Sequence, residues 1–114
     1  MRADDVVRIR HMIEAAESVG RFLAGRQRQD LDNNEMLRFA LTRAIEIIGE
    51  AAVRVSPETQ NEITQVPWKE VIGMRNRLVH AYFDVDLDIL WLTAREAVPA
   101  LLEKLATLES QGQI

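Results

Sequence analysis

The sequence predicts an all-α protein, and three observations carry this prediction. Hydrophobic residues recur at steps of three and four along most of the chain, which is the period of one helix face. Only five glycines and three prolines interrupt the 114 residues, so long elements joined by short connections are expected. No stretch of useful length alternates apolar and polar residues, as a half-buried strand would.

Length and composition narrow the class of protein further. A chain of 114 residues fits one domain better than two, and we interpret residues 1–114 as a single domain. The absence of cysteine excludes disulfides and thiolate zinc sites. No apolar run approaches the ~20 residues that span a bilayer, and no secretory signal is evident, so we expect a cytoplasmic protein without a membrane partner.

The net charge is −4, which argues against a general binder of duplex DNA, because such affinity depends on neutralising phosphates with Lys and Arg. A small basic site on an acidic body remains compatible with this charge. Arg75 and Arg77 are candidates for such a site, together with Lys69 and Arg54.

The first two helices are the longest expected elements. Hydrophobic periodicity predicts one from about Asp4 to Leu23 and another from about Asn33 to Val55. Asp32, with Glu35 three positions later, resembles a capping box that would start the second helix. The apolar stripe of this helix is wider than packing against a single neighbouring helix would bury. A subunit interface is one candidate for what covers the remaining apolar surface.

Short helices follow. Ser56-Pro57-Glu58 reads as an N-cap, a proline at the first helical position and an early acid, so a helix is expected to about Ile63. Pro67 should open a fourth helix that ends near His80 to Phe83.

The last helix should begin after Asp86 or Asp88, either of which can cap it. It continues through the apolar residues of the C-terminal segment. Pro99 removes one backbone donor there and should kink the helix near Arg95.

The side chains best suited to catalysis lie between Gly73 and Tyr82. Cleaving RNA without a metal requires removing a proton from the 2′-hydroxyl, supplying one to the leaving oxygen and stabilising charge at phosphorus. His80 can serve the proton steps, because imidazole titrates near neutrality. Arg75 can hold the phosphate with its planar fork of donors. Asn76 stands four residues before His80, on the same face of the expected helix, and could orient the ring or the phosphate.

The spacing raises a geometric difficulty. Five residues separate Arg75 from His80, which on an ideal helix places them roughly 140° apart. The reach of the arginine, a distorted helix end or a second subunit must close the gap. A dimer would also supply two imidazoles, one for each proton step.

Structural interpretations stand beside these functional ones. An arginine and a histidine on one helix are commonly surface residues, and Tyr82 could be a half-buried aromatic. Asp84, Asp86 and Asp88 alternate like calcium ligands, but the required glycine and bidentate glutamate are missing, so capping explains them better. The second histidine, His11, is interpreted as structural.

Several stretches together resemble the HepT-like toxins of the HEPN superfamily, from near Asp4 to about Leu105. They are Arg10-His11-Met12, residues 44–51 (AIEIIGEA), Val66-Pro67-Trp68, residues 72–82 (IGMRNRLVHAY), Val85-Asp86 and Leu90-Trp91.

The resemblance implies a HEPN-type antiparallel bundle of four to five helices that forms a homodimer with two facing motifs. It implies a toxin that cleaves RNA without a metal or cofactor through Arg75 and His80, supported by Asn76 and Arg77. The implied partner is a minimal nucleotidyltransferase antitoxin that transfers AMP from ATP to Tyr82. Bulk and negative charge added there would repel RNA from the site.

Two alternatives remain open. One is a non-catalytic helical subunit of a nucleotidyltransferase complex, because the fold alone does not decide function. The other is a nucleotide-binding domain in which Arg75 and Arg77 hold the phosphates of a small ligand. The lack of a glycine-rich phosphate loop disfavours the second alternative.

Overall fold

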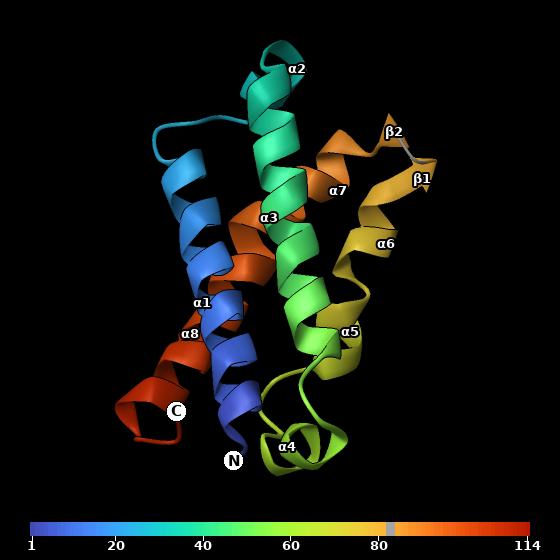
Figure 1. Ribbon diagram of the computed structural model, residues 1–114. Coiled ribbons are helices and arrows are strands. Elements are labelled where there is room, and N and C mark those ends of the chain that lie inside the picture. The colour runs from blue at the N-terminus through green and yellow to red at the C-terminus, as the bar shows by residue number, and fades with distance from the viewer. Residues whose placement is uncertain (82–83) are drawn as a thin grey trace.

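The two longest helices lie side by side at the centre of the structure (Figure 1). In this computed structural model, residues 1–81 and 84–114 are described, with the backbone alone at 79–81. α1 (Ala3–Leu23) and α3 (Glu35–Val53) run antiparallel, joined by a connection that contains α2 (Asp30–Asn33). The all-α prediction is confirmed for the described residues, apart from one small pair of strands.

The remaining elements return along the same axis, so that successive helical segments run up and down (Figure 1). After α3 the chain forms α4 (Pro57–Glu62), α5 (Trp68–Ile72), α6 (Met74–Leu78), β1 (Val79–Ala81), β2 (Asp84–Val85), α7 (Leu87–Leu92), the π-helix η1 (Thr93–Ala97) and α8 (Val98–Ser110). None of the helices that the structure describes is long and apolar enough to cross a membrane.

The core lies where α1, α3 and the C-terminal helices meet. Its fully buried side chains come mostly from the predicted apolar stripes, and burying each of them stabilises the fold by about 1.5–3 kcal/mol. They include Ile9, Met12 and Val19 of α1, Leu41, Ile45 and Ile48 of α3, and Leu90, Leu105 and Leu108 near the C-terminus.

The start of α3 differs from the prediction. The capping box of Asp32 and Glu35 is wrong, because Asp32 lies within α2, in a segment expected to be a connection. The N-cap is Asn34, whose extended backbone (φ −133°, ψ 97°) lets its Oδ1 accept a hydrogen bond from Leu37 N at 3.0 Å. An asparagine in this position satisfies one of the free N–H groups that begin every helix.

The predicted cap of α4 is confirmed, and a buried carboxylate reinforces it. Ser56 Oγ accepts a hydrogen bond from Thr59 N at 3.4 Å. Asp5 of α1 accepts bonds from Ser56 N, Ser56 Oγ and Thr59 Oγ1 at 2.9, 2.6 and 2.6 Å. These bonds fasten the beginning of α1 to the beginning of α4.

The predicted fourth helix is wrong in its extent, because it is two helices followed by a strand. Gly73 ends α5, donating from its N–H to Lys69 O at 3.1 Å, and α6 then ends at Leu78. Leu78 O accepts a bond from Asp86 N at 2.8 Å, and Val79 pairs with Val85 across an antiparallel hairpin. These partners replace the hydrogen bonds that would have continued the helix.

The C-terminal helix follows the prediction closely. Asp86 caps α7, its Oδ1 accepting bonds from Asp88 N at 3.0 Å and Ile89 N at 3.1 Å. The expected distortion near Arg95 is the π-helix η1. Pro99 cannot donate to the carbonyl four residues before it, and its ring crowds that carbonyl, so the turn widens.

Candidate functional site

The short helix α6 carries most of the predicted site, and its burial pattern sets which way each side chain faces. Met74 and Leu78 are buried and anchor the helix to the core. The residues between them, Arg75, Asn76 and Arg77, are exposed. Two apolar residues one turn apart thus present three polar residues to solvent.

Arg75 is held from α3 by Glu46. Its Nε donates a hydrogen bond to Glu46 Oε2 at 2.6 Å. The terminal amino groups of Arg75 make no hydrogen bond with any described residue, and the side chain is 46% exposed. The guanidinium is therefore held at one edge, and its terminal donors remain without a partner among the described residues, as binding an oxyanion requires.

Glu46 is the residue of the candidate site that sequence reasoning missed. Its Oε1 accepts a bond from Arg43 at 2.7 Å, and Arg43 also lies 3.3 Å from Glu50. The Arg43 hydrogen bond lowers the pKa of Glu46 despite partial burial, and Arg75 lowers it further. Glu46 is thus kept as an anion that orients Arg75. The available signal was a carboxylate between two isoleucines, in the most apolar stretch of the helix.

Arg77 faces a different side of α6. Its Nη2 donates to Glu70 O at 3.2 Å, and the side chain lines a groove between α5 and α8 with Lys104. Residues two apart on a helix do not share a face, which explains the separation from Arg75. Asn76 is exposed and makes no hydrogen bond with any described residue.

His80 belongs to β1, so the expectation that it shares a helix face with Asn76 is wrong. The 140° separation expected on an ideal helix does not apply either, because α6 ends two residues earlier. The side chain of His80 and the whole of Tyr82 lie outside the described part of the chain, so their predicted roles stay predictions.

The acidic run after the hairpin serves as helix cap and ion pair. Asp86 caps α7, and Asp88 pairs with Arg28 at 2.8 Å. His11, interpreted from the sequence as structural, is exposed and lines a hollow between α1 and α3.

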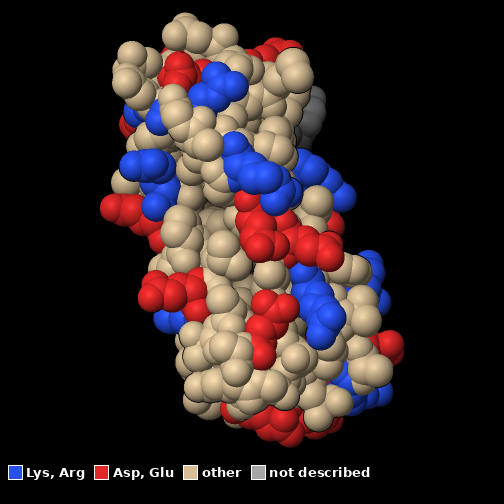
Figure 2. Space-filling model, turned by 90° about the vertical axis from the view of Figure 1, so that its left-hand side faces the viewer, with Lys and Arg blue, Asp and Glu red and all other residues tan. Residues whose placement is uncertain are grey.

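The face on which α1 lies carries basic and acidic side chains interspersed, so no single sign of charge covers it (Figure 2). Binding of a polyanion through this face would therefore depend on local groups of arginines.

Comparison with known proteins assigns the chain to a family. A family model described as Ribonuclease HepT-like matches residues 12–108. The chain belongs to the HepT-like ribonuclease family.

Relatives of this HepT-like chain carry names of the same kind. "Putative RNase MJ1380" of Methanocaldococcus jannaschii is 39% identical over 90 residues, covering 79% of this chain and 83% of the relative. "Probable ribonuclease HepT" of Thermococcus cleftensis is 37% identical, covering 83% and 86%. "Putative RNase TTE0752" of Caldanaerobacter subterraneus is 34% identical, covering 82% and 83%. No solved structure matches the chain.

Proposed function

We propose that this HepT-like protein is a metal-independent endoribonuclease and the toxin of a toxin–antitoxin pair. The observation that carries the proposal is the Arg75 guanidinium, which is bound to Glu46 through Nε and is 46% exposed, while its terminal amino groups make no hydrogen bond with any described residue. The family of the chain and the names of its relatives support an RNA substrate.

The reaction is a transesterification within the RNA. The 2′-oxygen attacks the adjacent phosphorus, the bond to the 5′-oxygen breaks, and a 2′,3′-cyclic phosphate and a 5′-hydroxyl result. Imidazole of His80 takes the 2′-hydroxyl proton or supplies one to the leaving oxygen. Arg75 stabilises the charge that builds on the phosphoryl oxygens, with Asn76 as a further donor.

A homodimer would provide the second imidazole, so that each proton step has its own group. The outer side of α1 and α3 offers a surface for it near their connection. We name Phe22, Met36 and Phe39 the apolar end patch; they are 37%, 82% and 66% exposed. Burying such side chains against a second copy would remove apolar area from water.

The antitoxin, a minimal nucleotidyltransferase, would silence the enzyme through Tyr82. The tyrosine oxygen attacks the α-phosphorus of ATP, pyrophosphate leaves, and AMP remains on the phenol oxygen. A phosphodiester near His80 and Arg75 would occupy and neutralise the phosphate-binding donors.

The decisive experiment is cleavage of a defined RNA by the purified, unmodified chain in excess EDTA, beside His80→Ala. We expect the wild type alone to cut and to leave 2′,3′-cyclic phosphate ends. Tyr82→Phe should cut as the wild type does but stay active with the antitoxin and ATP. Absence of cleavage by wild-type protein whose mass shows no modification would favour the non-catalytic subunit.

A further inference from the structure

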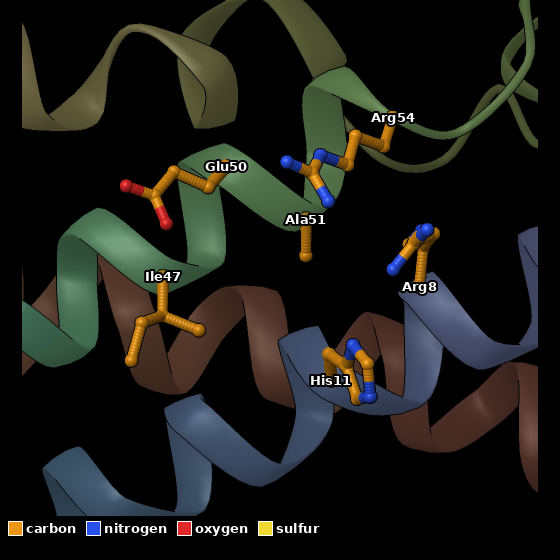
Figure 3. A pocket seen from close by; sticks show the side chains of 6 residues that line it. All are labelled: Arg8, His11, Ile47, Glu50, Ala51 and Arg54. Carbon is orange, nitrogen blue, oxygen red and sulfur yellow. The ribbon is translucent and has the colours of Figure 1, made fainter.

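A hollow between α1 and α3 gathers three nitrogen-bearing side chains that the proposed chemistry does not use. Arg8 and His11 come from α1, and Arg54 comes from the end of α3. In Figure 3 the three side chains lie around one space beside Ala51, while the Glu50 carboxylate points away from it. The hollow has a volume of about 130 Å³.

The two arginines of the hollow have no carboxylate partner in the described part of the chain. Glu50 lines the hollow, but it pairs with Arg43 of the same helix, which also pairs with Glu46. Arg8 and Arg54 make no ion pair with any described residue, although Arg8 is half-buried. Cations brought together without a counter-ion repel each other, and an anion between them relieves the repulsion.

The floor of the hollow strengthens its attraction for an anion. Ile47 and Ala51 close it with apolar surface, and Ala51 is 6% exposed. Charges beside a low-dielectric wall interact more strongly than in open water. Guanidinium groups and an imidazole N–H are also the donors that phosphate oxygens accept from most readily.

The position of the hollow relates it to Arg75. Residues 46, 50 and 54 of the chain are spaced by four, so they follow one face of α3 and its cap. Arg54 lies about 12 Å along this helix from Glu46, which holds Arg75. A single RNA strand spans that distance within a few nucleotides.

We infer that Arg8, His11 and Arg54 form a second phosphate-binding site, which holds a backbone phosphate of the RNA away from the bond that is cut. The inference rests on the proposed ribonuclease function for its ligand. The site fixes the position of the strand and carries no base specificity, because phosphate contacts position a nucleic acid without reading its sequence.

The test compares Arg8→Gln/Arg54→Gln with wild type and with Arg10→Gln. Arg10 is exposed on another face of α1, so its replacement removes a charge without touching the hollow. The probe is a fluorescent RNA series of increasing length, methylated at every 2′-oxygen so that it cannot be cut. Binding is followed by anisotropy across a range of salt concentrations.

We expect the double variant to bind long probes about tenfold more weakly at low salt, the effect of losing charged hydrogen bonds. Its log–log salt slope should be smaller by roughly 0.7, the contribution of one phosphate in a single strand. The shortest probes should bind equally well to both proteins, and Arg10→Gln should match wild type. Equal slopes for the double variant and wild type on long probes would overturn the inference.

Further arms separate the possible outcomes. In one outcome, inorganic phosphate binds the wild type, but the double variant and the wild type bind RNA with the same affinity. The hollow would then be a site for free anions, and the assignment to RNA would be overturned. With cleavable RNA, the double variant should show a raised KM at similar kcat. If the double variant cleaves RNA with the KM of the wild type and its probe binding has the same salt slope, the second phosphate-binding site is refuted while the nuclease proposal stands. Probe binding that shows the expected differences without cleavage would refute only the nuclease proposal.

Discussion

Arg75 binds Glu46 through Nε alone, and this choice of atom matters at the scale of a single residue. The hydrogen bond limits rotation of the guanidinium while leaving both terminal amino groups without a hydrogen bond to any described residue. Glu46 is itself fixed by Arg43 at 2.7 Å. In the proposed reaction this arrangement would orient a phosphate-binding donor before the substrate arrives, which would lower the entropic cost of reaching the transition state.

Replacing Glu46 by alanine should reduce cleavage without removing any group that touches RNA. We expect kcat to fall by roughly ten- to a hundredfold, because Arg75 loses its fixed orientation. Glu46→Gln should recover part of the loss, since its oxygen can still accept from Nε. Glu50→Gln is the control, because Glu50 contacts Arg43 but not Arg75. Equal rates for Glu46→Ala and wild type would show that orientation by Glu46 is unimportant.

Asp5 is a second residue whose environment determines its effect. It is 3% exposed, and burial by itself would raise the pKa of its carboxyl. Hydrogen bonds from Ser56 and Thr59 outweigh burial, so the pKa is lowered from its ordinary value of 3.8. A lowered folded-state pKa stabilises the fold above the unfolded pKa, and this contribution is lost as pH falls through the folded value.

Asp5→Ala should therefore lower the free energy of unfolding at pH 7 by about 2–3 kcal/mol, because buried donors lose their acceptor. Urea unfolding of variant and wild type measures the difference. It should narrow as the pH falls from about 4 through the folded pKa of Asp5. Asp4→Asn, an exposed neighbour, should change stability little. A difference that stays constant into acid would contradict the ionised, hydrogen-bonded carboxylate.

At the scale of elements, the close approach of α5 to α3 positions the helix that carries Arg75. A Cβ added to Gly49 of α3 would lie 3.3 Å from Ile72 O and 3.6 Å from Val71 O. Both atoms belong to the backbone of α5, which leads directly into α6. The glycine thus permits a helix contact that a larger residue would open.

Gly49→Ala and Gly20→Ala should change stability in opposite directions. Gly20 lies within α1 with open space around the added carbon, so alanine should stabilise by about 0.5–1 kcal/mol. At Gly49 the same gain in helix propensity is outweighed by crowding against a backbone carbonyl, and we expect a net loss of about 1 kcal/mol. Thermal unfolding of both variants measures this contrast. Stabilisation by both substitutions would show that α5 moves away freely.

At the scale of the whole molecule, the apolar end patch and the candidate phosphate hollow lie near opposite ends of the α1–α3 pair. Phe22 lies in the last turn of α1 and Met36 in the first turn of α3, whereas Arg8 lies in the second turn of α1 and Arg54 follows α3. A dimer formed through the patch would therefore leave the hollow open to RNA.

Phe39→Lys should break the proposed dimer, because it places a charge in the centre of the buried contact. Light scattering should give the mass of one chain for this variant and of two for the wild type. Cleavage should fall with the dimer, since each site loses its second imidazole. Leu92→Lys is the control, because Leu92 of α7 is 53% exposed outside the patch. A wild-type mass of one chain with full cleavage would refute the dimer.

The sequence determined the all-α class, the bounds of α1, the cap Ser56 and the distortion before Pro99, and it limited the cap of α7 to Asp86 or Asp88, of which the structure uses Asp86. These features depend on residues close together in the chain, through periodicity, capping and the missing donor of proline. The residue types of the candidate site, Arg75 and His80 above all, also came from the sequence alone.

Only the tertiary structure decided where α6 ends and what surrounds Arg75. Leu78 O binds Asp86 N across the hairpin, and Glu46 reaches Arg75 from 29 positions away in the chain. Such contacts form between segments that are distant in sequence, and helical periodicity carries no information about them. The gathering of Arg8, His11 and Arg54 has the same origin, because α1 and α3 bring them together only by packing side by side.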